Sequence, residues 1–243
     1  MKKLGIVGGM GPAATAKLFS RIIDFTDVET DQEHIEITIL NNPQIPDRTA
    51  YILGRSQESF VPLLQSMSQE LQDGGCEVIA MPCNAAHSHW AEINEGIDRA
   101  TFINMLRETA LLLRDLGCSR PGLLATDGII VSRVFHDELA ACGLETIVPD
   151  ENQQAQVMSA IYDYVKAGRD IPAGLLDEVC DHLISKGADS LILGCTELAF
   201  LGIPLRYKGI PVADTIDVLA WRSVLECGAP AKDLRVCYAG GSV

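Results

Sequence analysis

Short apolar runs alternate along the chain with longer segments in which apolar residues recur at helical spacing. A short apolar run bounded by turn residues is typical of a buried strand, and apolar residues three or four positions apart mark one face of a helix. The pattern predicts strands at 4–7, 35–40, 78–81, 101–103, 122–125, 145–148, 190–193 and 210–212. It predicts helices at 13–25, 58–72, 132–141, 152–166, 175–186 and 215–226. Strands that alternate with helices indicate a parallel α/β architecture. Beyond Cys227 no period is evident, which predicts a short strand and a frayed end.

Two segments of the chain match each other without a gap, which indicates an internal repeat. Residues 75–84 read GCEVIAMPCN, and residues 187–196 read GADSLILGCT. Each segment begins at a glycine turn, continues through an acidic residue into an apolar strand, and ends in a small residue, a cysteine and a polar residue. A shorter match joins residues 5–8 to residues 122–125. The sequence therefore predicts two related halves.

The repeat places two cysteines, Cys83 and Cys195, just past the carboxyl ends of equivalent strands. Open α/β sheets bind ligands at that edge. Each cysteine also precedes a predicted helix start, where backbone N–H groups favour a thiolate. Two thiols that face each other across a cleft suit removal of a proton from carbon and its return from the opposite side. The alternative is two buried cysteines that only fill the core.

Composition limits the partners of the chain. The formal net charge of −14 argues against nucleic acid and against an anionic membrane surface. Eight cysteines in 243 residues, with no C-x-x-C pair, indicate reduced thiols in a cytoplasmic protein and neither a disulfide framework nor a zinc ribbon. An apolar stretch after two lysines resembles a signal peptide, but its glycines break the expected helix. No apolar run is long enough for a membrane span.

The glycine-rich loop at residues 8–12 follows the first predicted strand and opens a helix, as in the loose dinucleotide fingerprint. Confirmation of that fingerprint needs an acidic residue at the end of the second strand, which ends instead in Asn41 and Asn42. The loop is therefore expected to make a tight turn or to offer backbone donors to a carboxylate. A dinucleotide cofactor is therefore not expected.

Two cations and two further polar residues are candidates for the same site. Arg48 ends a proline-fixed loop and is either a bidentate carboxylate clamp or a surface residue paired with Asp47. Lys166 ends a predicted helix and is typical of a surface lysine that complements the helix dipole. His87 lies either on a helix face near a reactive thiol or at the surface, and no set of metal ligands is evident around it. Glu197 either orients a group near Cys195 or is an acidic residue at a helix N-terminus.

Taken together, these residues resemble the aspartate/glutamate racemase superfamily, and within it the aspartate racemases. The resemblance runs from residue 2 to about residue 226. It rests on the motifs at 5–12 (GIVGGMGP), 41–49 (NNPQIPDRT), 81–84 (MPCN) with His87, 123–126 (LLAT) and 194–197 (GCTE).

The resemblance implies a cofactor-independent isomerase that racemises aspartate, and also glutamate, by a two-base mechanism. One cysteine thiolate abstracts the Cα proton and the other thiol protonates the opposite face. Cys195 would act on the L-enantiomer and Cys83 on the D-enantiomer. Arg48 is expected to bind the side-chain carboxylate and Lys166 to be a second cation beside the substrate. The substrate-lining positions implied by the resemblance are Met10, Asn84, Ala85, Thr126 and Thr196.

The resemblance also implies an architecture. Two similar parallel-sheet α/β domains related by a pseudo-twofold would hold the active site in the cleft between them. The first domain would comprise residues 1–103, with the segment 214–243 packing back on it, and the second would comprise residues 104–213. Members of the superfamily are commonly dimers, so a cytoplasmic homodimer is expected.

Two departures from the superfamily pattern bear on the substrate. Ala85 stands where a threonine hydroxyl would bind the α-carboxylate, a loss worth about 1–3 kcal/mol. Asp127 stands where an uncharged residue is usual, and a carboxylate in the cleft would repel an acidic substrate. A related isomerase or decarboxylase of the superfamily, or a non-catalytic dicarboxylate-binding protein, therefore stays open as an alternative.

Overall fold

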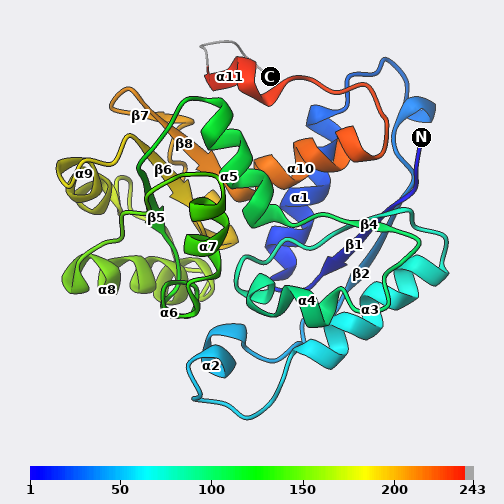
Figure 1. Cartoon of the computed structure of the whole chain (residues 1–243), viewed down its shortest axis with the longest axis horizontal. Helices are drawn as coiled ribbons and strands as arrows, with labels where there is room; N and C mark the ends of the chain where they lie inside the picture. The colour runs from blue at the N-terminus through cyan, green and yellow to red at the C-terminus, as the bar shows by residue number, and fades with distance from the viewer. Residues whose placement is uncertain (239–243) are drawn as a thin grey trace.

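The computed structural model describes residues 1–238, which form two four-stranded sheets (Figure 1). The strands are β1 (Leu4–Gly8), β2 (Ile37–Asn41), β3 (Val78–Ala80), β4 (Thr101–Phe102), β5 (Pro121–Leu124), β6 (Ser190–Leu193), β7 (Arg206–Tyr207) and β8 (Ile210–Asp214). The first sheet has the order β2-β1-β3-β4 and is parallel throughout. The second has the order β5-β6-β8-β7 and is parallel except for the β7–β8 hairpin. The predicted fold class is confirmed.

Helices connect and cover the strands. The α-helices are α1 (Pro12–Phe25), α2 (Arg48–Ile52), α3 (Val61–Asp73), α4 (Trp90–Ile93), α5 (Met105–Asp115), α6 (Asp127–Ser132), α7 (Val134–Ala141), α8 (Glu151–Ser159), α9 (Asp177–Ser185), α10 (Thr215–Glu226) and α11 (Leu234–Tyr238). The short helical turns are η1 (Asp31–Glu33), η2 (Ala85–His89), η4 (Thr196–Phe200) and the π-helical η3 (Ala160–Val165). None of these described helices combines the length and the apolar character that a bilayer span requires.

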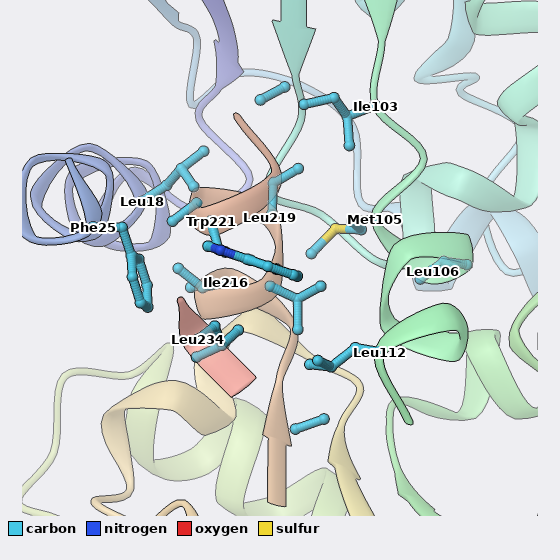
Figure 2. Close-up of a cluster of buried hydrophobic side chains, with 14 of the residues drawn as sticks. Leu18, Phe25, Ile103, Met105, Leu106, Leu112, Ile216, Leu219, Trp221 and Leu234 are labelled. Atoms are coloured by element: carbon cyan, nitrogen blue, oxygen red, sulfur yellow. The ribbon is translucent and has the colours of Figure 1, made fainter. Parts of the chain in front are cut away.

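The core has a central layer shared by the two sheets and an outer layer on each side. Because neighbouring strand residues point to opposite faces, Ile6 of β1 faces the central layer and Val7 faces α3. In the second sheet Leu123 faces the central layer and Leu124 faces α8 and α9. The central layer itself is built from α1, α5 and α10, and Figure 2 shows side chains of these three helices packed together.

The internal repeat corresponds to a repeated strand order. β1 lies beside β3 in the first sheet as β5 lies beside β6 in the second. A bridge from Gly122 to Ile147 occupies the place that β2 has in the first sheet. Cys83 follows β3 and Cys195 follows β6, so the two cysteines lie at the ends of equivalent strands.

The last long helix returns to the first half of the chain. α10 follows β8 of the second sheet, yet it packs along α1 and also against α5. The domain boundaries at residues 103 and 213 stay predictions. Residues 239–243 of the predicted returning segment lie outside the described residues.

Several predicted elements differ from the observed ones. The expected strand at 145–148 is only the single bridge at Ile147, because Pro149 follows and lacks an N–H for a ladder. The short strand expected in the tail is instead helix α11, whose Tyr238 hydroxyl donates to the carbonyl of Val212 at 3.0 Å. The predicted helix at 152–166 divides into α8 and the π-helical turn η3. Helices α2, α4, α5 and α6 and strand β7 were not predicted.

Candidate active site

A small pocket of about 20 Å³ lies where β3 and β6 end, with walls from both halves of the chain. All of the predicted site residues except His87 line it, namely Met10, Arg48, Cys83, Asn84, Ala85, Thr126, Lys166, Cys195, Thr196 and Glu197. Residues far apart in sequence therefore meet as the resemblance implied, while their roles stay a matter of proposal.

Glycines let the backbone reach this pocket. A Cβ at Gly9, whose φ is +110°, would collide with the backbone oxygen of Asn42, so the loop after β1 is a close turn against the end of β2. A Cβ at Gly194 would lie 2.6 Å from a methyl carbon of Leu123. A larger residue at position 194 would therefore displace Cys195 from the end of β6.

Asn84 is fixed in orientation by its neighbours. The Thr215 hydroxyl donates to the carbonyl of Leu193 at 3.0 Å and accepts from Asn84 Nδ2 at 3.0 Å. This chain of bonds leaves Asn84 Oδ1, a buried acceptor, without a hydrogen-bond partner among the described residues. An amino group is the kind of donor that this oxygen lacks.

His87 lies behind Cys83 and outside the pocket. Burial lowers the pKa of His87 to about 4, so the ring is neutral at pH 7. Nδ1 donates to the carbonyl of Cys83 at 2.8 Å, and Nε2 accepts from the N–H of Met105 at 3.3 Å. The ring also stacks on Trp90. The neutral imidazole therefore supports the backbone of Cys83 and does not face a substrate.

Cys195, Glu197 and Lys166 form a connected group on the opposite side. The thiol of Cys195 donates to Glu197 Oε2 at 3.0 Å, and Lys166 Nζ pairs with Glu197 Oε1 at 2.8 Å. Burial raises the pKa of Cys195 well above its ordinary value, the charge of Glu197 raises it further, and Lys166 opposes the rise. Burial would also raise the pKa of Glu197, but Lys166 and Cys195 outweigh it and lower that pKa. In the resting protein Cys195 is a thiol and Glu197 is a carboxylate.

One expectation for this group was wrong. A helix start was expected to favour a thiolate at Cys195, but η4 is a single short turn and desolvation dominates. Lys166 is an exposed residue, as its place in the helix indicates, but its side chain is only 27% exposed because its ammonium group pairs with the buried Glu197.

Arg48 points into the pocket because its loop positions it there. Asp47 does not pair with it and instead caps α2 by accepting from Ala50 N at 2.7 Å. The Arg48 Nη1 atom donates to the carbonyls of Ile45 and Pro46, at 3.1 and 2.8 Å. Its buried Nε has no hydrogen-bond partner among the described residues. Burial opposes the charge, but Cys83 and Asp47 more than offset it and raise the pKa of Arg48, so the group is a cation.

Asp127 lies outside this pocket, contrary to the sequence expectation. It lines a neighbouring cavity of about 690 Å³, where its Oδ1 accepts from Gln154 Nε2 at 2.9 Å. Thr126, one position earlier, does reach the pocket and lies 3.3 Å from the Thr49 hydroxyl. The start of α6 therefore turns Thr126 inward and Asp127 outward.

Some lining residues were not predicted, namely Asp47, Thr49, Ile129, Tyr162 and Gly194. A signal for Tyr162 was available, because it precedes Lys166 by four positions and therefore shares its helical face. Within residues 1–238 no three histidine, cysteine or carboxylate side chains gather in a way that could hold a metal ion.

Comparison with known proteins relates nearly the whole chain to racemases. Residues 7–223 match the Asp/Glu/Hydantoin racemase family. The broad specificity amino-acid racemase RacX of Bacillus subtilis is 25% identical, with 91% of this chain and 96% of that protein covered. The solved structure of Picrophilus torridus aspartate racemase is 31% identical with a TM-score of 0.82, covering 98% of this chain and 99% of that one. Glutamate racemase from Francisella tularensis, solved in complex with D-glutamate, has a TM-score of 0.64 at 16% identity and covers 96% and 84%, which shows a shared fold.

Proposed function

The chain belongs to the Asp/Glu/hydantoin racemase family, and we propose that it racemises aspartate, and also glutamate, with Cys83 and Cys195 as its acid–base pair. One observation carries the proposal. Two cysteines from equivalent strands of the two sheets line one pocket, beside a buried donor and a buried acceptor that lack partners among the described residues. Buried polar atoms normally have hydrogen-bond partners, so two unpartnered ones beside the thiols are not explained by cysteines that only fill the core.

The reaction needs only proton transfers. One sulfur, as a thiolate, takes the proton from Cα and leaves the electron pair delocalised into the α-carboxylate. The other sulfur, as a thiol, delivers its proton to the opposite face of that carbon. The product has the inverted configuration, and the two cysteines have exchanged their protonation states. Side chains that transfer protons in this way contribute about 10²–10⁴-fold to a rate.

The two cysteines have different surroundings in the resting pocket. Cys195 carries its proton, because burial and Glu197 both disfavour its thiolate. Cys83 lies beside the cationic Arg48. Cys195 therefore starts as the acid, and the superfamily assigns the D-enantiomer to Cys83 as its base. Glu197 acts as a positioning residue for the thiol of Cys195.

The polar atoms of the pocket suit an amino-acid substrate. Arg48 Nε and the ammonium of Lys166 are donors for carboxylates, and Asn84 Oδ1 is an acceptor for the α-ammonium group. Met10, Thr126 and Thr196 complete the walls, and Ala85 offers no hydroxyl where the superfamily has one. The α-carboxylate then depends on the cations and on backbone donors.

No cofactor enters the proposal, since two thiols supply both the acid and the base. We propose that the protein works as a homodimer in the cytoplasm, as the superfamily and the eight unpaired cysteines suggest. We also propose that its domains are residues 1–103 with 214–243, and residues 104–213.

Solvent exchange tests the function directly. L- and D-aspartate and L- and D-glutamate are incubated with the protein in D₂O, and loss of the Cα proton signal is followed together with optical rotation. A racemase exchanges the proton while the rotation decays to zero. Release of carbon dioxide would indicate a decarboxylase. Ligand-dependent melting without any exchange would indicate a binding protein, and either result would overturn the proposal.

A further inference from the structure

Thr215 is the first residue of α10, and its side chain has no exposed surface. It does not line the pocket between the cysteines but is hydrogen-bonded to Asn84, which does. Asp214, the residue before it, caps α10 by accepting from Ile216 N at 2.9 Å. The helix packs along α1 and also against α5 and β3. Thr215 is therefore held by an element of the core.

The hydroxyl group of Thr215 joins the two segments that carry the cysteines. It donates its single proton to the carbonyl of Leu193 at 3.0 Å, and Leu193 ends β6 two positions before Cys195. Its oxygen accepts from Nδ2 of Asn84 at 3.0 Å, and Asn84 directly follows Cys83. One side chain therefore contacts the backbone that leads to one cysteine and the side chain that follows the other.

The number of protons available determines which way the amide of Asn84 faces. A carbonyl cannot donate, so the Thr215 proton is used by Leu193 and only lone pairs remain for Asn84. The NH₂ group of Asn84 must therefore point to Thr215, because a rotated amide would place its oxygen against another acceptor oxygen. Asn84 lines the pocket and is 2% exposed, and Oδ1 is its polar atom without a hydrogen-bond partner among the described residues. An acceptor in this place favours a ligand that brings a donor.

We propose that Thr215 is a positioning residue that makes the site select ligands with an α-amino group. The inference rests on the proposed function, in which Asn84 Oδ1 accepts from the α-ammonium group of the substrate. Thr215 acts through Asn84, because it holds the amide in the orientation that offers an acceptor. Succinate carries the same two carboxylates as aspartate at the same spacing but has no amino group. The hydroxyl group of Thr215 therefore contributes to the preference for aspartate over succinate.

The test measures the dissociation constants of DL-aspartate and of succinate by titration calorimetry, and their ratio reports on the amino group. The racemic mixture is used because turnover does not change its composition. Thr215→Val removes the hydroxyl group at nearly constant shape. Because a hydrogen bond contributes modestly to affinity, this variant should bind aspartate roughly three- to tenfold more weakly and bind succinate equally well or more tightly. Thr215→Ser keeps the hydroxyl group and should retain the ratio of the unmodified protein.

A double-mutant cycle shows whether Thr215 acts through Asn84. Asn84→Ala removes the acceptor and should itself lower the preference for aspartate, and Thr215→Val should then have no further effect in that background. Thr26→Val is the matched control, since it also removes a buried threonine hydroxyl that donates to a backbone carbonyl, that of Ile22 at 2.7 Å, outside the pocket. It should leave the ratio unchanged, and melting curves check that each variant folds.

Three results would overturn the role of Thr215: an unchanged ratio in Thr215→Val, an equal loss of preference in Thr215→Ser, or an additive effect in the Asn84→Ala background. Exchange of the Cα proton of aspartate in D₂O, measured on the same proteins, separates this role from the proposed function. Exchange together with an unchanged ratio would overturn the role of Thr215 alone. A lowered ratio without any exchange would overturn the racemase but uphold the selection of the amino group. Binding of neither ligand by the unmodified protein would overturn both proposals.

Discussion

The thiol of Cys195 donates a hydrogen bond to Glu197, with 3.0 Å between Sγ and Oε2. The same carboxylate holds Lys166 at 2.8 Å through its other oxygen. The Cys195 thiol and the Lys166 ammonium group are therefore connected through the two oxygens of one carboxylate, that of Glu197. Burial has the largest effect on the pKa of Cys195, and the carboxylate and the ammonium shift that pKa further in opposite directions.

Substitutions on either side of Cys195 should move its pKa in opposite directions. Glu197→Gln removes a charge that raises the pKa of Cys195 and should lower it, whereas Lys166→Met removes a charge that lowers the pKa and should raise it further. Thiolate absorbance in the ultraviolet, followed against pH and corrected with matching Cys195→Ser variants, measures both shifts. A general disturbance of the fold would move the two in the same direction.

Removal of one cysteine should abolish racemisation but leave exchange of one enantiomer. Cys195→Ser keeps Cys83 and should still exchange the Cα proton of D-aspartate, and Cys83→Ser should do the same for L-aspartate. Racemisation should fall by about 100-fold or more in each. Optical rotation and Cα exchange in D₂O measure the two quantities. Cys180→Ser, a buried cysteine outside the pocket, is the control. Racemisation at full rate in either catalytic variant would contradict the two-base mechanism.

Arg48→Lys keeps the positive charge but loses the planar fork that matches a carboxylate. A hydrogen bond to a charged group contributes about 1.5–3 kcal/mol, so KM for aspartate should rise about 10- to 100-fold, with a smaller change in kcat. Initial rates over a range of aspartate concentrations give both constants. Arg99→Lys, at a side chain that is 62% exposed, should change neither. An unchanged KM in Arg48→Lys would show that Arg48 does not bind the substrate.

His87 should make the fold sensitive to acid. The unfolded chain takes up a proton near pH 6.5, and the folded chain resists protonation of His87 down to about pH 4. Protonation between these values favours the unfolded state, so the free energy of unfolding should fall by at most about 3 kcal/mol as pH drops through this window. Urea unfolding at pH 7, 5.5 and 4 measures it. His87→Asn should be less stable at pH 7 but have a shallower pH dependence, and an equal slope would argue against the assignment.

The central layer should be the most sensitive part of the core. Leu219 of α10 is fully buried between elements of both halves, as Figure 2 shows. Leu219→Ala should cost about 2–5 kcal/mol, from lost transfer free energy and the cavity left behind. Val236→Ala, at a residue that is 52% exposed, should stay within about 0.5 kcal/mol. Urea midpoints compare the two, and a similar small change for Leu219 would show that α10 is loosely packed.

The sequence predicted most strands and long helices because their apolar residues follow the period of each element. It missed α5, although Asn104 caps that helix, because residues 110–113 form a continuous apolar run that fits a strand as well as a helix. The strand at 145–148 was wrong because Pro149 ends the pairing after a single bridge. The local apolar pattern is therefore enough to predict most helices and strands. Where a run fits both, the residues packed around it determine which one forms.

The candidate site shows the same limit. Motifs indicated which residues meet, but the direction of a side chain depends on distant partners. Asp127 turns away from the pocket because Gln154 of another helix binds it. Cys195 keeps its proton because burial and the charge of Glu197 raise its pKa. The short turn after Cys195 does not stabilise a thiolate enough to offset them. Neither outcome is visible in a period or a spacing.

The packing of α10 on α1 has a consequence for synthesis on the ribosome. The apolar face of α1, which includes Leu18, Ile22 and Phe25, emerges early, but the helix that covers it is translated almost a full chain length later. Until then the apolar face of α1 is exposed on the nascent chain. Exposed apolar surface of this kind is bound by chaperones and otherwise promotes aggregation. Translation of residues 215–226 is therefore the moment at which the first half of this protein becomes able to finish folding.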